Sequence, residues 1–367
     1  MNELTQNEPA QNGLTQNEPA QSGLTRNGPR QSGLTRNGPA LPPGQTTMEG
    51  APVPDKTLRI NRAGDHPARQ RPVLLAIAGD SAAGKTTLTA GLVEVLGPER
   101  CVSLCTDDYH RYDRIERKAL PFTALHPECN YIEIMEQHLQ LLASGQPILK
   151  PVYDHATGQL TRPELVEPND FVIVEGLFPL YTKLARACFD VTVFLDPPEP
   201  TRREWKVRRD IAKRGYTREQ VLAELAVREP ESEAFIRPQR QHADVVVRFG
   251  PIASRQDPEG TPLSAELMLR PTIRHPDLSG VLRPGLNRTM HLKLTRDTDG
   301  RPVDTLHIHG YVPQEASAVV ARAIWASIGN PDSAVPQALG RLGPDARSEP
   351  LAITQLLLLH HLAEAAR

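Results

Sequence analysis

An apolar run that passes directly into a glycine-rich turn constrains the fold of this chain more than any other feature. Residues 73–79 read VLLAIAG and follow Pro72, a pattern typical of a buried parallel strand. Residues 79–86 read GDSAAGKT, which satisfies GxxxxGK[ST], and helical spacing begins directly after them. A strand, a glycine-rich turn and a helix in this order predict a phosphate-binding loop in an α/β fold.

The loop contains the residue types that a nucleotide phosphate requires. Glycines let backbone N–H groups face an anion at a helix N-terminus, Lys85 adds positive charge, and Thr86 offers a hydroxyl to Mg²⁺. We therefore predict ATP as co-substrate and Mg²⁺ as cofactor. An ordinary turn into a helix is the alternative, and the loop alone does not identify the phosphoryl acceptor. The predicted ATP-binding residues are Gly79, Asp80, Ser81, Ala82, Ala83, Gly84, Lys85 and Thr86.

Later patterns predict a doubly wound, mostly parallel sheet with additions after Gly250. Strands alternate with helical patterns, which is the order of an α/β domain. Asn130 is expected to cap one helix, and Thr217 with Gln220 forms a capping box for another. The later strands alternate in polarity and turn at Asp299-Gly300, which indicates added antiparallel strands. Expected strands lie at residues 102–105, 171–174, 191–195, 245–249, 263–270, 291–297 and 303–310, and the last helices near 315–328 and 351–365.

Composition divides the chain into three parts. Residues 1–70 carry a repeated motif beginning LTQNEPAQNG, which has too few aliphatic side chains to offset chain entropy, so we expect a disordered extension. Residues 71–250 are the predicted core. Residues 251–367 are predicted to form a C-terminal extension that packs on this core.

The overall charge excludes some classes of protein. Lys and Arg total 42 against 44 Asp and Glu, giving a net charge of -2, so no nucleic-acid or membrane-surface partner is expected. The apolar stretch 351–362 is too short and too interrupted by His to span a bilayer. These features predict a cytoplasmic protein, and they are compatible with a homo-oligomer. The four cysteines have no metal-type spacing and are expected to be reduced: Cys101, Cys105, Cys129 and Cys188.

Charged residues follow the predicted strands where the crevice of an open α/β sheet forms. Asp107 is placed to take a hydroxyl proton, while His110 and Arg114 are candidates for binding a phosphate. A charged surface loop is the alternative. Glu175 ends another strand, where an acid directed at Mg²⁺ would lie.

One later helix carries a basic face. Lys206, Asp210 and Arg214 recur every four residues, with Arg209 beside them. The face is either a phosphate clamp or a solvated set of ion pairs.

Together these motifs resemble the phosphoribulokinase branch of the phosphoribulokinase and uridine kinase family of P-loop kinases. The resemblance covers about residues 73–249 and depends on TDDYHRYDR, TALHPECNYIEIMEQ, KPVYDHATG, VIVEGLFPLY and WKVRRDIAKRG. It implies transfer of the ATP γ-phosphoryl to D-ribulose 5-phosphate, a small sugar phosphate, as in the Calvin cycle. A uridine kinase-like nucleoside kinase and a non-catalytic nucleotide sensor remain alternatives.

The resemblance also implies roles for single residues. Asp107 would be the general base, with Lys85 and Asp210 as further catalytic residues. Thr86 would be a metal ligand, and either Glu175 or Asp210 the nearer carboxylate. The implied substrate-binding residues are His110, Arg114, Tyr153, His155, Lys206, Arg209 and Arg214.

Two positions bear on redox control. Members of the family that are regulated through thiols carry a cysteine in the loop where this chain has Ala83, and Cys105 matches the partner cysteine. Half of the pair is absent, so we expect no thiol switch of that kind.

Overall fold

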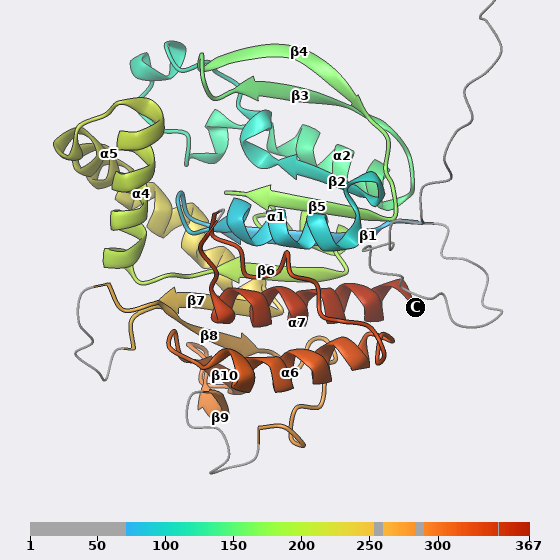
Figure 1. The fold of residues 1–367 in the computed structure, drawn as a ribbon. Coiled ribbons are helices and arrows are strands. Elements are labelled where there is room, and N and C mark those ends of the chain that lie inside the picture. The colour runs from blue at the N-terminus through green and yellow to red at the C-terminus, as the bar shows by residue number, and fades with distance from the viewer. Residues whose placement is uncertain (1–70, 253–259, 283–289, 344) are drawn as a thin grey trace, which may run out of the picture. The chain divides into compact units, whose positions relative to one another are not determined.

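The computed structural model describes residues 71–252, 260–282, 290–343 and 345–367, so the extension predicted for residues 1–70 lies outside the described part. The main feature is one sheet with the strand order β2-β5-β1-β6-β7-β8-β10-β9 (Figure 1). Its strands are β1 (Val73–Gly79), β2 (Cys101–Cys105), β5 (Phe171–Gly176), β6 (Val191–Leu195), β7 (Val245–Gly250), β8 (Ser264–Leu269), β9 (Met290–Arg296) and β10 (Pro302–Ile308).

The first five strands of this order are parallel. β1 lies between β5 and β6, and β2 and β7 pair in parallel on either side. β8 runs antiparallel to β7, and β9 and β10 form the hairpin that was predicted at Asp299-Gly300. The predicted α/β fold, with a mostly parallel sheet and added antiparallel strands, is confirmed. All parallel strands therefore end at one edge, where the charged motifs follow them.

Helices cover both faces of the sheet. One face carries α1 (Lys85–Leu96), α6 (Gln314–Ser327) and α7 (Glu349–Ala366), which lie in front of the strands in Figure 1. The opposite face carries α2 (Ile132–Ala143) and α3 (Lys183–Cys188). The apolar alternation within the strands divides the core between these faces: in β1, Leu75 packs on the α1 side and Leu74 on the α2 side.

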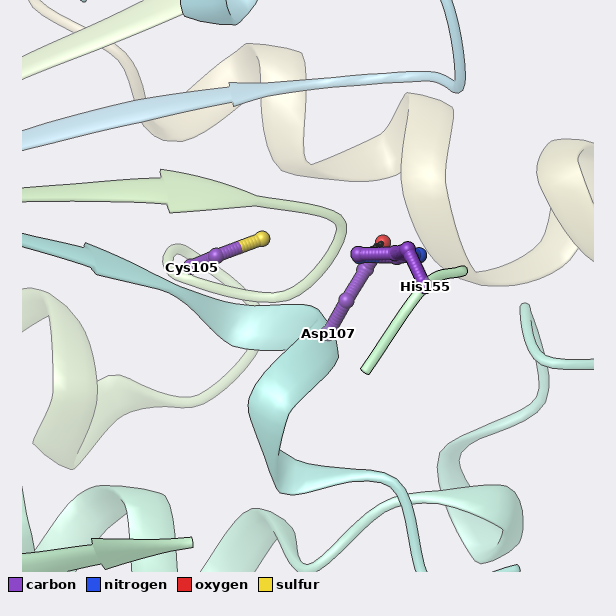
Figure 2. A group of neighbouring side chains, drawn as sticks. All are labelled: Cys105, Asp107 and His155. Carbon is purple, nitrogen blue, oxygen red and sulfur yellow. Dashed lines mark ion pairs between the residues drawn. The ribbon is translucent and has the colours of Figure 1, made fainter. Parts of the chain in front are cut away.

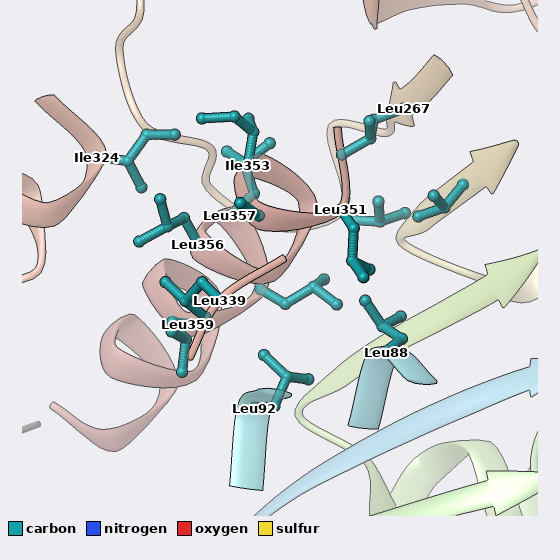
Figure 3. Close-up of a cluster of buried hydrophobic side chains, with 14 of the residues drawn as sticks. Leu88, Leu92, Leu267, Ile324, Leu339, Leu351, Ile353, Leu356, Leu357 and Leu359 are labelled. Atoms are coloured by element: carbon teal, nitrogen blue, oxygen red, sulfur yellow. The ribbon is translucent and has the colours of Figure 1, made fainter. Parts of the chain in front are cut away.

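The last helix packs against the helix that follows the phosphate loop. Leu88 and Leu92 of α1 lie in the same buried cluster as Leu356 of α7 (Figure 3). Gln355 donates from Nε2 to the Leu88 carbonyl at 3.1 Å, and its Oε1 accepts a hydrogen bond from Gly340 N at 2.8 Å. Residues late in the chain thus contribute to the core around α1.

Two helices lie beyond the carboxyl ends of the parallel strands. They are α4 (Glu199–Arg214) and α5 (Arg218–Glu231) (Figure 1). The capping box predicted for Thr217 and Gln220 begins α5 as expected. A π-helical turn, Ser232–Ile236, follows α5 directly.

Three features differ from the sequence-based expectation. Asn130 does not cap α2: the cap position is Tyr131, because the Asn130 amide bonds His110 and the carbonyls of Ala124 and His126. β2 lies at the edge of the sheet and its Ser103 is exposed, whereas strands of a parallel sheet are typically buried on both faces. A separate hairpin of β3 (Ile148–Asp154) and β4 (Gln159–Val166) was not predicted. The short helical turns are Pro98–Arg100, Thr106–Tyr109, Glu116–Ala119, Pro127–Cys129 and Arg237–His242.

Candidate active site

The phosphate loop connects β1 to α1. Lys85 Nζ donates to the carbonyl oxygens of Gly79 at 2.9 Å and Asp80 at 2.8 Å, so the ammonium group lies over the loop. Gly84 precedes α1 with a left-handed backbone (φ 98°) and no side chain caps the helix. The first N–H groups of α1 are therefore left for an anion.

The Asp80 side chain holds the loop in place, while a role of this residue in binding ATP stays a prediction. The residue is 7% exposed, and its carboxylate accepts hydrogen bonds from the Ser81 N–H at 2.7 Å and from the Ser232 hydroxyl. Arg202 of α4 lies 3.6 Å from the same carboxylate and donates to the Ser81 carbonyl at 3.2 Å. The π-helical turn and α4 thus hold the loop in place.

Thr86 and Glu175 meet at the start of α1. Thr86 Oγ1 donates to Glu175 Oε1 at 3.0 Å, and Thr89 Oγ1 donates to Oε2 at 3.3 Å. Burial raises the pKa of Glu175, although the nearby Lys85 charge and these two hydrogen bonds oppose the shift. The predicted pair of oxygen ligands is therefore brought together.

The acidic turn after β2 lies against the end of β5. Thr106 Oγ1 accepts a hydrogen bond from Leu177 N at 2.9 Å. Gly176 has φ 152°, and a β-carbon there would clash with the Thr106 side chain, so this approach requires glycine. The two neighbouring acids have different surroundings. The Asp108 carboxylate accepts hydrogen bonds from Lys150 Nζ and Tyr153 N, whereas the Asp107 carboxylate is near enough to the phosphate loop to interact with the Lys85 charge.

Positive charge surrounds Asp107. Burial alone would raise the pKa of this carboxyl, but the neighbouring imidazoles of His110 and His155 and the charges of Lys85 and Arg228 outweigh it and lower the pKa. His155 Nε2 lies 3.7 Å from Asp107 Oδ2. Asp107 is therefore ionised at neutral pH, as a proton acceptor must be.

Three aromatic rings, those of Tyr153, His110 and His155, pack together beside Asp107. The Tyr153 ring meets His110 and His155 edge to face, with centroids 4.9 and 5.1 Å apart. His110 is buried, and Nδ1 lies 2.7 Å from Asn130 Oδ1; burial lowers the pKa of His110. Arg117 donates to the Tyr153 hydroxyl at 2.6 Å. These contacts hold Tyr153 and both imidazoles beside Asp107.

Arg114 shapes the turn after β3. Its guanidinium donates to the carbonyl oxygens of His155 at 2.5 Å and Ala156 at 3.5 Å, and its backbone N–H donates to Gly158 O at 2.7 Å. In this structure it positions His155, while a direct role in binding a phosphate stays a prediction.

The basic face of α4 surrounds one buried acid. Asp210 contacts Lys206 Nζ at 2.8 Å, Arg209 Nε at 2.9 Å and Arg214 Nη1 at 3.5 Å. Arg209 also donates to Ser81 Oγ at 3.4 Å, which joins the cluster to the phosphate loop. Burial, with the charge of Arg228, lowers the pKa of Lys206. Both Asp210 oxygens face cations. Within the described part of the chain, the carboxylate that contacts Thr86 Oγ1 is Glu175.

Comparison with known proteins identifies the family. A profile of the Phosphoribulokinase / Uridine kinase family matches residues 74–254. A uridine kinase of Chloroflexus aurantiacus is 31% identical over 184 residues, which cover 49% of this chain and 88% of that protein. The chain belongs to this family.

Other relatives add detail within the Phosphoribulokinase / Uridine kinase family. A phosphoribulokinase of Synechocystis is 43% identical over 204 residues, which cover 56% of this chain and 61% of that relative. The solved phosphoribulokinase from Rhodobacter spheroides has a TM-score of 0.50 at 18% identity and covers 71% of this chain and 97% of its own, which supports the P-loop kinase fold.

The structure adds site residues that the sequence did not single out. Arg202 was detectable, because it continues the four-residue spacing of Lys206, Asp210 and Arg214 back by one turn. The others depend on contacts distant in sequence and had no local signal of a role in the site: Arg117, Asn130, Arg228 and Ser232. No described helix is long and apolar enough to cross a membrane.

Proposed function

We propose that this chain transfers the γ-phosphoryl group of ATP to a hydroxyl of D-ribulose 5-phosphate, giving ADP and D-ribulose 1,5-bisphosphate. The observation that carries the proposal is the convergence at one sheet edge of a phosphate loop and an ionised Asp107 surrounded by cations. The 43% identity with the Synechocystis phosphoribulokinase supports this acceptor.

The donor half of the reaction uses the phosphate loop. Backbone N–H groups at the start of α1 and the Lys85 ammonium bind the β- and γ-phosphates, and Lys85 exchanges its two loop carbonyls for phosphate oxygens. Arg209, which already contacts Ser81, is close enough to the loop to add charge as the phosphoryl group moves. Catalysis on this side is positioning and electrostatic stabilisation.

The acceptor half uses Asp107. The carboxylate takes the proton of the attacking hydroxyl while the bond to the γ-phosphorus forms and the bond to the leaving ADP oxygen breaks. His110 and His155 flank it and orient the sugar. The cations nearby, including Arg228 and Arg117, favour an acceptor that carries its own phosphate.

The residues around Thr86 fit a Mg²⁺ ion. Thr86 Oγ1 and Glu175 Oε1 are hard oxygen donors 3.0 Å apart beside the phosphate loop, and Mg²⁺ prefers a few such oxygens together with substrate phosphates. Thr86 would bind the ion and Glu175 would hold it directly or through water. When bound, the ion neutralises charge on the β- and γ-phosphates.

A uridine kinase activity is the second candidate, because the Chloroflexus uridine kinase matches over 88% of its length. The cationic surroundings of Asp107 argue for the sugar phosphate, since a nucleoside acceptor carries no phosphate for those charges to bind.

The test is ADP release from purified protein and Mg-ATP in three parallel reactions. One contains ribulose 5-phosphate, one contains uridine, and one contains no acceptor. We expect turnover with ribulose 5-phosphate that Lys85→Ala abolishes without lowering the melting temperature. Turnover with uridine alone would replace the proposal with the second candidate. An absence of turnover with any acceptor, despite ATP binding, would favour a nucleotide sensor.

A further inference from the structure

Three chemically different side chains converge beside the proposed base. Cys105 ends β2, Asp107 lies in the turn that follows, and His155 comes from the turn after β3. One ligand atom from each lies within 4.8 Å of the other two. Figure 2 shows the thiol of Cys105 on the same side as the Asp107 carboxylate and the His155 ring.

The geometry is close to that of a metal site. Zn²⁺ accepts thiolate, imidazole and carboxylate ligands at about 2.0–2.3 Å, so two ligand atoms in a tetrahedral site lie about 3.4 Å apart. His155 Nε2 and Asp107 Oδ2 already lie 3.7 Å apart. The Cys105 thiol lies within 4.8 Å of the other two ligand atoms, so it has to approach each of them by no more than about 1.4 Å.

The residues behind the three ligands hold them in place. Arg114 donates to the His155 carbonyl at 2.5 Å, and the Tyr153 ring packs against the His155 ring. The turn that carries Asp107 is fixed through Thr106 Oγ1, which accepts from Leu177 N. Such supporting contacts orient ligands before a metal arrives.

We propose that Cys105, Asp107 and His155 form a binding site for Zn²⁺, and that a zinc ion bound there inhibits the enzyme. Three protein ligands leave a fourth position open to water, as in zinc sites that are not purely structural. Mg²⁺ does not compete for this set, because it prefers oxygen ligands in octahedral geometry.

Inhibition follows from the role of Asp107 and therefore rests on the proposed function, whereas metal binding itself does not. A zinc ion on the carboxylate occupies the oxygen that accepts the hydroxyl proton and fills the space where the sugar must enter. The positive charges of Lys85 and Arg228 oppose a second cation, so we expect weaker binding than at a four-ligand structural zinc site.

Co²⁺ is the probe for binding, because cobalt bound to a thiolate gives a charge-transfer absorption in the near ultraviolet. We expect the full chain, in buffer without thiol reductant, to show this band at one Co²⁺ per chain, and Zn²⁺ but not Mg²⁺ to remove it. Cys105→Ser should abolish the band. Cys101→Ser is the matched control, because it removes a cysteine from the same strand outside the cluster and should leave the band unchanged.

A wild-type chain without the band, or a Cys105→Ser variant that keeps it, would overturn the site. Circular dichroism checks that the Cys105→Ser variant is folded. If that variant does not fold, His155→Gln is used instead, because the His155 side chain is 49% exposed; this substitution should weaken Co²⁺ binding at least tenfold.

Turnover is measured separately. A cobalt band in a protein that does not phosphorylate ribulose 5-phosphate would leave the site standing and remove the proposed function. If the enzyme is active, Zn²⁺ should inhibit it, and Cys105→Ser should need at least about tenfold more Zn²⁺ for the same effect.

Discussion

Thr86 Oγ1 lies 3.0 Å from Glu175 Oε1, which ties the first turn of α1 to the carboxyl end of β5. The contact joins residues distant in sequence at the point where the phosphate loop ends. It places a hydroxyl and a carboxylate together on the side of the loop where a Mg²⁺ ion bound to ATP would lie.

Substitutions of Thr86 separate the hydroxyl from the shape of the side chain. Thr86→Val keeps the branched shape and removes the oxygen, so we expect at least about a hundredfold loss of kcat and a higher Mg²⁺ requirement. Thr86→Ser keeps the oxygen and should stay within about tenfold of wild type. Rates are measured against Mg²⁺ concentration at fixed ATP. Equal losses in both variants would mean that the methyl group, not the hydroxyl, is required.

The neighbouring acids Asp107 and Asp108 give a matched pair of variants. Asp107→Asn should lower kcat at least about a hundredfold, with little change in ATP affinity or melting temperature, because it removes the proposed base. Asp108→Asn should instead destabilise the fold by about 1–3 kcal/mol, because Asp108 bonds the largely buried Lys150 and the Tyr153 backbone. Steady-state kinetics and thermal melts on both variants test this, and a reversed pattern would exchange the two roles.

Local sequence signals predicted the elements that carry the site. The apolar run of β1, the glycine-rich loop, the β6 run and the Thr217 capping box each depend on neighbouring residues, so they were readable without tertiary information. The same holds for Asp107 and Glu175, which directly follow or end a strand and therefore meet at one sheet edge.

Contacts that cross the fold were not predictable. Asn130 looked like a helix cap, but its amide is used by His110 and two carbonyls of its own loop. Ser232 reaches Asp80 only because a π-helical turn follows α5, and nothing in the local sequence marks that turn as a partner of the phosphate loop. The edge position of β2 depends on strand order, which periodicity does not contain.

Gly91 tests whether the C-terminal helix is part of the core. A β-carbon at Gly91 would collide with the side-chain amide of Gln355 in α7. We therefore expect Gly91→Ala to destabilise the protein by about 1–3 kcal/mol, despite the better helix propensity of Ala. In a Gln355→Ala background the same change should be neutral or stabilising by up to about 1 kcal/mol. Denaturant unfolding of the wild type, the two single variants and the double variant measures the coupling free energy between Gly91 and Gln355. Additive effects would show that α1 and α7 do not touch at this point.

The thiols near the site should react slowly. Burial raises the pKa of Cys101 to about 12 and raises that of Cys105 as well, so little thiolate exists at neutral pH in the metal-free protein. Ala83 leaves the phosphate loop without a thiol partner for Cys105. We expect mild oxidation to change turnover less than about twofold and both cysteines to be alkylated at least about tenfold more slowly than free cysteine. Reversible inactivation that Cys105→Ser abolishes would contradict this.

His361 predicts how stability depends on pH. His275 Nε2 lies 2.7 Å from the Arg270 carbonyl and carries the proton there, so His275 Nδ1 accepts from His361 Nε2 at 3.3 Å. This pairing requires the His275 ring to be neutral, because its Nδ1 accepts the hydrogen bond. Burial, with repulsion from His275 and His360, lowers the pKa of His361 to about 3.

As pH falls, the fold should therefore lose stability before the carboxylates become protonated. In the unfolded chain His361 titrates near pH 6.5, so between about pH 6.5 and 3 the unfolded state binds the proton and the folded state does not. Stability falls as pH falls through this window, and His361 alone accounts for roughly 2 kcal/mol between pH 7 and 5. Denaturant unfolding at several pH values measures the slope, and His361→Gln should reduce it because Gln does not titrate. An unchanged slope in that variant would assign the acid sensitivity to the other histidines whose pKa is lowered by burial, His110, His275 and His360.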